Sequence, residues 1–324
     1  MGLTPAILFA LAGFLLLAGG GEVLVRGAVS VSRRLGISTS VIGLTVVAMA
    51  TSLPELAVSL VAALRGNPDL AVGNVVGSNI FNLAVILAVT AVLFPPLRFR
   101  ANLIRVDVAF MTATMVLAVG LARDGEVDSR EGVLLLALLA GFLVYRARSA
   151  RRPDVPHGEV DERDIAAELA PRDRSRLGVA RSFALVFAGA ALLTAGGELL
   201  VRGAVVIAEI AGVSQRVIAV TLVSVGTSLP ELATCVMAGV RRHSAVAVGN
   251  LIGSNIFNTC GILGTVAVTR TVGVSHAFIA RDMWWMLGFC LVAIVPAVAR
   301  GRGISRTDGV LALAAYVVYL ATLL

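Results

Sequence analysis

Long apolar runs separated by short polar turns fill the chain from end to end. Ten runs can be counted, and each is long enough to cross a hydrocarbon core of roughly 30 Å as an α-helix. They cover about residues 5–27, 38–64, 69–93, 103–121, 131–147, 178–201, 213–239, 244–268, 280–299 and 308–324. The pattern therefore predicts an all-α integral membrane protein with ten transmembrane helices.

One polar stretch, from Arg148 to Arg176, interrupts the pattern between the fifth and sixth runs. It contains three prolines and mixed Arg, Asp and Glu, which is typical of a hydrophilic linker. We therefore predict a first five-helix repeat over residues 1–147, a linker over 148–177 and a second five-helix repeat over 178–324.

The two predicted halves repeat each other at a constant offset of 176 residues. Gly-Gly-Glu-x-Leu-Val-Arg-Gly stands at 20–27 and 196–203, Thr-Ser-Leu-Pro-Glu-Leu at 51–56 and 227–232, and Gly-Asn-x-x-Gly-Ser-Asn-Ile-Phe-Asn at 73–82 and 249–258. Because each half has an odd number of spans, the second half is expected to enter the membrane from the opposite side. Inverted repeats with interrupted helices in matching positions are the architecture of secondary transporters.

The charge distribution indicates topology rather than a nucleic-acid partner. The chain is 58% hydrophobic with a mean hydropathy of +0.92, and its net charge of +7 comes from arginine alone among the basic side chains, because lysine is absent. Arginine is enriched in the loops on one side, including the linker, and these loops are expected to be cytoplasmic. We therefore predict a cell-membrane protein with both termini outside, whose arginine-rich loops also contact anionic lipid.

A carboxylate and a proline lie at membrane depth in each half, and both are costly there. Glu55 and Glu231 require neutralisation or a bound cation, and proline frees backbone carbonyls, expected near Ala48, Ala50 and Ser224. Carboxylate, hydroxyl, amide and carbonyl oxygens are hard ligands; about six to eight suit Ca²⁺, and fewer suit Na⁺. Without His or Cys in the motifs, soft metals are disfavoured.

The paired motifs closely resemble the two α-repeats of the cation/calcium antiporter superfamily, typified by sodium/calcium exchangers. The resemblance covers all ten predicted spans and implies ten helices in two inverted halves, with one Ca²⁺ site flanked by Na⁺ sites. Carried over by motif position, it implicates Glu55 and Glu231 as shared ligands, together with Thr51, Ser52, Ser78, Asn82, Thr227, Ser228, Ser254 and Asn258.

Two positions depart from the family pattern. Ala50 stands where glycine is usual before Thr-Ser, and Asn258 stands where some relatives carry Asp. With Asn258, only two carboxylates remain in the centre of the implied site. In this respect the chain resembles the potassium-independent exchangers more than the potassium-dependent branch.

The leading hypothesis is an electrogenic antiporter that exchanges Ca²⁺ for Na⁺ by alternating access, while the first and sixth helices slide past a fixed core. Ca²⁺/H⁺ exchange with protons carried by Glu55 and Glu231 is an alternative, coupling to K⁺ stays open, and a cation channel is a third reading. Without a base near Ser52 or Ser228, no enzyme activity is expected. No cofactor is predicted beyond the transported ions, and the sequence does not indicate an oligomeric state.

Several other side chains have simpler interpretations. Glu22 with Arg26 and Glu198 with Arg202 stand four residues apart and are expected to form ion pairs. Asp107 and Asp282 are expected to pair with Arg105 and Arg281 at the interface. The three cysteines at 235, 260 and 290 are interpreted as packing residues, and Asn74 and Asn250 as residues that cap or brace a helix.

Overall fold

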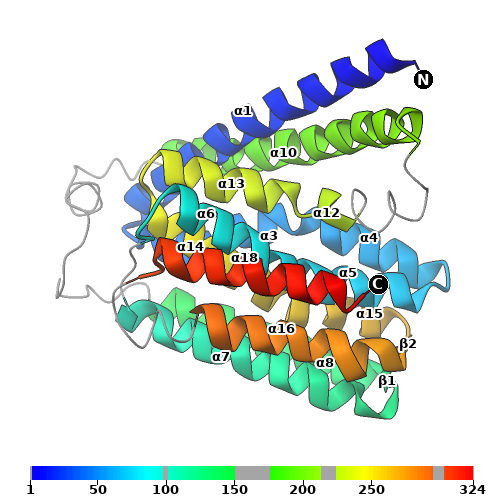
Figure 1. Cartoon of the computed structure of the whole chain (residues 1–324). Helices are drawn as coiled ribbons and strands as arrows, with labels where there is room; N and C mark the ends of the chain where they lie inside the picture. Colours follow the sequence, from blue (N-terminus) through cyan, green and yellow to red (C-terminus); the bar gives the residue numbers. More distant parts are fainter. Residues whose placement is uncertain (1, 98–100, 150–175, 213–223, 295–302, 324) are drawn as a thin grey trace.

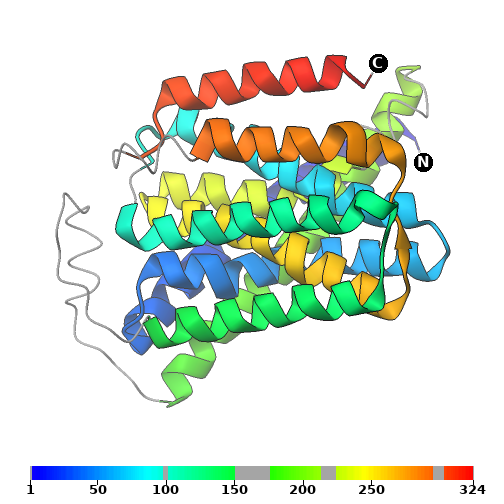
Figure 2. The same ribbon diagram turned by 90° about the horizontal axis from the view of Figure 1, so that it is seen from below.

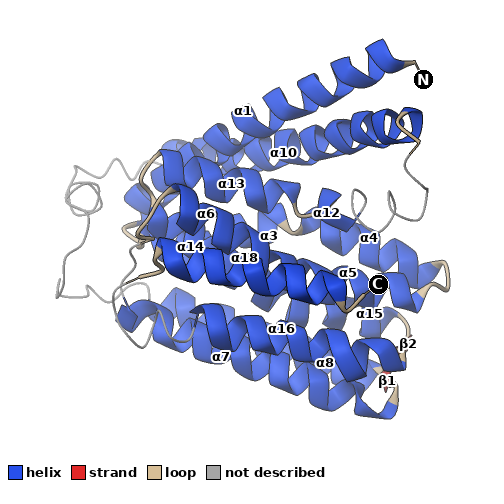
Figure 3. Ribbon diagram, in the orientation of Figure 1, coloured by secondary structure: helices blue, strands red, loops and turns tan. Residues whose placement is uncertain are grey.

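The computed structural model is almost entirely helical (Figure 3) and describes residues 2–97, 101–149, 176–212, 224–294 and 303–323. The first part of the chain forms α1 (Leu3–Leu35), α2 (Thr39–Ile42), the π-helical segment η1 (Gly43–Val47), α3 (Ala48–Thr51), α4 (Leu53–Leu64), α5 (Pro68–Phe81), the π-helical segment η2 (Asn82–Ile86), α6 (Leu87–Leu93), α7 (Ala101–Leu121) and α8 (Ser129–Ser149).

The second part forms α10 (Arg176–Ile210), α12 (Ser224–Gly226), α13 (Leu229–Val240), α14 (Ser244–Ile256), the π-helical segment η5 (Phe257–Ile262), α15 (Leu263–Thr269), η6 (Phe278–Asp282), α16 (Met283–Phe289), η7 (Cys290–Ile294) and α18 (Arg306–Ala321). The only strands within the described ranges are β1 (Glu126–Val127) and β2 (Val272–Gly273), which pair antiparallel and join the α7–α8 turn to the segment after α15.

The described helices are long and apolar enough for a membrane protein. Six of them could each cross a bilayer: Leu3–Leu35, Pro68–Leu93, Arg105–Asp124, Ser129–Ser149, Leu177–Ile210 and Ser244–Thr269. A seventh crossing is the pair Thr39–Thr51 and Leu53–Leu64, bent by 43°. The runs at 213–239 and 280–299 extend beyond the described residues, as does most of the 148–177 linker, and α18 is shorter than a full crossing. The count of ten therefore stays a prediction.

Helices α1 and α10 lie side by side and cover one face of the molecule, while α7, α8 and α16 cover the opposite face (Figures 1 and 2). Large apolar side chains on the outer helices are exposed, for example Phe14 at 63% and Val317 at 65%. Exposed apolar surface of this extent is unfavourable in water and favourable against lipid. The chain is therefore an all-α, multi-pass membrane protein.

Glycine allows α1 and α10 to pack backbone against backbone. A Cβ at Gly13 would lie 2.4 Å from the Leu200 nitrogen, and one at Gly203 would lie 2.5 Å from the Ala6 carbonyl oxygen. Glycines with such contacts recur every seven residues on both helices, at 13, 20 and 27 and at 189, 196 and 203. Because residues early in α1 contact residues late in α10, the two helices are antiparallel. Small residues at such interfaces drive helix association in membranes.

Buried polar contacts tie the outer helices together in pairs, and one of them corrects a prediction. Asp107 on α7 is fully buried and accepts a 3.0 Å bond from Arg146 on α8, rather than pairing with Arg105 at the interface. Sequence proximity pointed to the wrong arginine, because the helix turns Asp107 inward toward α8. The Arg281–Asp282 pair is confirmed.

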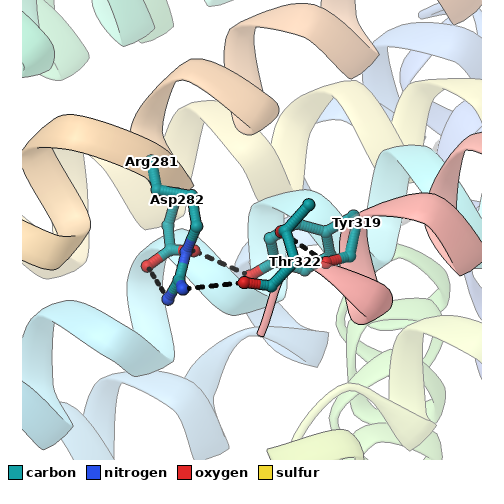
Figure 4. Close-up of polar contacts among 4 residues, drawn as sticks. All are labelled: Arg281, Asp282, Tyr319 and Thr322. Atoms are coloured by element: carbon teal, nitrogen blue, oxygen red, sulfur yellow. Dashed lines mark hydrogen bonds and ion pairs between the residues drawn. The ribbon is translucent and has the colours of Figure 1, made fainter. Parts of the chain in front are cut away.

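Figure 4 shows how Asp282 also connects to the last helix. The Tyr319 hydroxyl donates to Asp282 over 3.2 Å, and Arg281 donates to the Thr322 carbonyl over 3.1 Å. Trp285 and Phe289 of α16 pack against the rings of Tyr316 and Tyr319. These contacts hold α16 and α18 together beside the core that carries the site.

Candidate cation-binding site

Each Thr-Ser-Leu-Pro-Glu motif breaks a helix at its serine. Ser52 (φ −87°, ψ 8°) ends α3 and begins α4, and Ser228 (φ −92°, ψ 7°) stands before α13 in the same conformation. Proline lies in the first turn of α4 and of α13, where its missing amide hydrogen is tolerated. The break places each glutamate in the first turn of a helix, close to the serine of the opposite half.

Serine and glutamate are paired reciprocally across the two halves. The Ser52 hydroxyl donates to Glu231 Oε1 over 2.9 Å, and the Ser228 hydroxyl donates to Glu55 Oε1 over 3.1 Å. All four side chains are buried, with 0–1% exposure. The two motifs, distant in sequence, therefore form one cluster at the centre of the helical core.

Serine and threonine residues surround this cluster. Ser78 of α5 lies 3.2 Å from the Ser228 hydroxyl. Thr51 and Ser254 of α14 are neighbours of Glu231, and the buried Ser254 hydroxyl has no hydrogen-bond partner. Thr227 is half-buried and donates to an amide oxygen of α5. The structure thus brings together eight of the ten predicted site residues through direct contacts or near neighbours.

Asn82 and Asn258 occupy matching positions in two π-helical segments. Asn82 opens η2 and Asn258 lies in η5, and these segments pack against α13 and α4 respectively. π-helical turns within α-helices are frequent at functional sites. Both residues are 1% exposed, yet neither Oδ1 atom has a hydrogen-bond partner. Neither side chain has a hydrogen bond to Glu55 or Glu231.

The cluster is rich in oxygens that lack partners. Glu55 Oε2 and Glu231 Oε2 are buried without a hydrogen bond, as are the two asparagine oxygens in the π-helical segments. Buried carboxylate oxygens without partners are costly, and a hard cation satisfies them. Among the described residues, no three His, Cys, Asp or Glu side chains gather to hold a metal. The arrangement therefore suits a hard cation held by two carboxylates and neutral oxygens.

One predicted ligand group is wrong. The Ala48 carbonyl was expected to be free, but it accepts from the Ser52 amide at 3.0 Å and lies 3.3 Å from the Thr51 hydroxyl. The missing amide of Pro54 affects the carbonyl four residues earlier, at Ala50. In the second half, the Ser228 amide donates to the Val225 carbonyl at 3.1 Å, one residue beyond the predicted Ser224.

Asn74 and Asn250 are more closely linked to the site than the sequence interpretation allowed. Asn250 Oδ1 accepts from Thr51 and Asn74 Oδ1 accepts from Thr227, each over 3.3 Å. A signal was available in the sequence, because Asn74, Ser78 and Asn82 follow one another at four-residue intervals and share a helix face. The asparagines brace helices, as predicted, but they do so across the two halves.

Comparison with known families decides the identity of this fold. The family model described as sodium/calcium exchanger protein matches the chain twice, over residues 5–148 and 181–324. The chain belongs to this family. It is therefore a member of the cation/calcium antiporter superfamily, whose proteins are transporters, and the resemblance seen in the motifs is confirmed.

Individual relatives agree over nearly the full length. The chain is 34% identical to inner membrane protein YrbG of Escherichia coli, covering 96% of this chain and 94% of that protein. It is 29% identical to sodium/calcium exchanger MaX1 of Methanosarcina acetivorans, covering 99% of both. It also superposes on a solved structure of the sodium–calcium exchanger NCX_Mj, soaked with 10 mM Na⁺ and no Ca²⁺, with a TM-score of 0.82, 29% identity and full coverage of both chains.

Proposed function

We propose that this antiporter exchanges Ca²⁺ for Na⁺ by alternating access, with one cation cluster shared by both halves. The observation that carries the proposal is the reciprocal pairing of Ser52 with Glu231 and of Ser228 with Glu55. It joins two buried carboxylates to neutral hydroxyl oxygens in one place. The sodium/calcium exchanger relatives and the NCX_Mj structures soaked with Na⁺, Ca²⁺ or Sr²⁺ support the same pair of ions.

All four hydroxyls of the two Thr-Ser pairs favour Na⁺ over H⁺ as the coupling ion. Ser52 and Ser228 donate their protons to the glutamates, and Thr51 and Thr227 donate to amide oxygens. Their oxygen lone pairs thus stay available for a cation. Hydroxyl and amide oxygens are good ligands for Na⁺ but poor proton carriers at ordinary pH. Only the two carboxylates in the cluster could carry protons.

We further propose ten transmembrane helices in two inverted repeats, with the linker 148–177 cytoplasmic and both termini outside. Three observations support this arrangement: the family model matches each half separately, α1 and α10 are antiparallel, and the two termini lie at the same end of the molecule (Figure 1). Arginine enrichment in the predicted cytoplasmic loops gives the orientation.

The decisive experiment is ⁴⁵Ca²⁺ uptake into proteoliposomes under imposed ion gradients, each applied alone. Vesicles loaded with Na⁺ and diluted into Na⁺-free medium should accumulate Ca²⁺. If three Na⁺ leave for each Ca²⁺ that enters, one positive charge leaves per cycle, so an interior-positive potential should accelerate uptake.

Other results would identify another mechanism. Uptake driven by a pH gradient and indifferent to Na⁺ would indicate Ca²⁺/H⁺ exchange by Glu55 and Glu231. Uptake that depends on an imposed K⁺ gradient would add K⁺ to the cycle. Conductive Ca²⁺ flux without any counter-ion would contradict antiport and indicate a channel.

A further inference from the structure

Two matching hydrogen-bond chains lead away from the cation cluster, and each ends at a backbone carbonyl. In the first, which we call the Ser59 relay, Thr227 donates to Asn74 Oδ1 over 3.3 Å, and Asn74 Nδ2 donates to Ser59 Oγ over 2.9 Å. Ser59 in turn donates to the Ala71 carbonyl over 3.4 Å. The relay begins in one half of the chain and ends in the other.

The second chain, the Cys235 relay, has the same plan. Thr51 donates to Asn250 Oδ1 over 3.3 Å, Asn250 Nδ2 donates to Cys235 Sγ over 3.6 Å, and Cys235 donates to the Ala247 carbonyl over 3.6 Å. Each member stands 176 positions from its counterpart in the Ser59 relay. Cys235 and Asn250 are both completely buried.

The direction of each relay is fixed by chemistry. Because a carbonyl oxygen only accepts, the Ser59 hydroxyl must donate its hydrogen bond to the Ala71 carbonyl, and the Cys235 thiol must donate to the Ala247 carbonyl. Their oxygen and sulfur atoms then face the asparagines as acceptors, which requires the asparagine NH₂ groups to point toward them. Asn74 Nδ2 also donates to the Glu55 carbonyl over 3.0 Å, which fixes its amide independently.

At the end nearest the cation cluster, each relay therefore presents only an amide oxygen to its threonine. A threonine that faces an amide oxygen donates its proton there, and its lone pairs remain free for a cation. For Thr51 the nearby Ala48 carbonyl is a second acceptor, which has the same effect on the hydroxyl. Groups that orient a ligand in this way strengthen metal binding without touching the metal.

We propose that Asn74 and Asn250 are positioning residues that hold the Thr227 and Thr51 hydroxyls with their lone pairs toward the cation, through relays anchored by Ser59 and Cys235. This proposal rests on the cation cluster of the proposed function and assigns a role to four residues outside it. Because a thiol is a weaker donor and acceptor than a hydroxyl, the hydrogen bonds of the Cys235 relay are weaker than those of the Ser59 relay. A hydroxyl in place of the thiol should strengthen them.

The test compares Cys235→Ala with Cys235→Ser, which differ little in size but differ in hydrogen bonding. Ca²⁺ affinity is measured by calorimetry on the purified full-length protein, and half-saturating Ca²⁺ by ⁴⁵Ca²⁺ uptake in proteoliposomes. Cys235→Ala should weaken Ca²⁺ binding about three- to tenfold, the effect of one lost hydrogen bond. Cys235→Ser should bind at least as tightly as the wild-type protein.

Matched variants separate positioning from packing. Ser59→Ala should reproduce the loss in the other relay, and Ser59→Cys should give an intermediate affinity. In a Thr51→Val background the hydroxyl that the relay orients is gone, so the difference between Cys235→Ala and Cys235→Ser should disappear. A packing role would make Cys235→Ala the better tolerated change, because it buries no additional polar group.

Two kinds of result would overturn the relay. Equal Ca²⁺ affinities for the Ala and Ser variants, with wild-type binding intact, would overturn the relay alone, and so would a difference that persists with Thr51→Val. Absence of Ca²⁺ binding by the wild-type protein would overturn the proposed function and the relay together. Coupling to H⁺ instead of Na⁺ would leave the relay standing, because the comparison depends on Ca²⁺ affinity.

Discussion

Glu55 and Glu231 are the two carboxylates of the cluster, and each has one buried oxygen without a hydrogen bond. Replacing either with Gln keeps the size but removes the charge that substitutes for the hydration of a divalent ion. We expect each variant to fold and to lose about tenfold to a hundredfold in Ca²⁺ transport, since roughly 1.5–3 kcal/mol is lost with a charged partner. Proteoliposome ⁴⁵Ca²⁺ uptake measures this.

The control for that prediction is Glu126→Gln. Glu126 is exposed in the short strand β1, so its substitution should keep the Ca²⁺ affinity of the cluster. Unchanged uptake by either Glu55→Gln or Glu231→Gln would contradict a site shared by both halves.

Asn258→Asp tests whether the π-helical asparagines contribute to ion choice. The variant would add a third carboxylate where a buried amide oxygen now has no partner. A third negative charge near the cluster should hold cations more tightly, so we expect Ca²⁺ release to slow and the preference among Na⁺, K⁺ and Ca²⁺ to change. The measurement is exchange rate against each ion. If the rate and ion preference stay the same, Asn258 does not face the site.

Helix α1 is attached to the core at one end by an ion pair that α10 lacks. Arg241, at the C-terminal cap of α13, donates through Nε to Glu22 over 2.7 Å and also through its terminal nitrogen, and Arg26 pairs with the same carboxylate. One repeat away, the equivalent residues are Glu198 and Arg65. Both are described by the structure, and no ion pair joins them.

In alternating access by two inverted halves, we expect the Glu22–Arg241 pair to break when the equivalent Glu198–Arg65 pair forms. Glu22→Gln should weaken the contact at the Arg241 end and open that end in more molecules. A partly exposed pair contributes about 0.5–1 kcal/mol, so half-saturating Ca²⁺ at that face should fall about two- to fivefold. Glu198→Gln should change it in the opposite direction. The measurement requires vesicles of known orientation. If Glu22→Gln and Glu198→Gln shifted half-saturating Ca²⁺ in the same direction, the proposed exchange of ion pairs would be contradicted.

Topology applies to the chain as a whole and can be tested by labelling. The arginine distribution predicts that a cysteine introduced at Asp161, in the linker, resists impermeant thiol reagents in intact cells and reacts after permeabilisation. The background must lack the three native cysteines, all of which are buried. Cys235 should be replaced by Ser, because Ala would break the relay that it anchors. Labelling in intact cells would show that the linker lies outside, and the predicted orientation would then be reversed.

Much of this molecule was determined by local patterns in the sequence. Apolar runs long enough to cross a bilayer set the fold class, because a lipid-exposed backbone must satisfy its own hydrogen bonds as a helix. The constant offset of 176 residues aligned the two halves, so Glu231 was identified as the counterpart of Glu55. Two carboxylates placed at membrane depth beside proline are costly enough for the sequence alone to indicate a cation site.

The partners of each group, by contrast, were decided by the tertiary structure, because a contact across helices depends on which face each helix turns inward. Asp107 pairs with Arg146 on the next helix instead of its sequence neighbour Arg105. The glycines of α1 pack against α10, and Asn74 and Asn250 reach threonines in the opposite half. Periodicity gives the face of one helix, but only the packing of all of them fixes what that face meets.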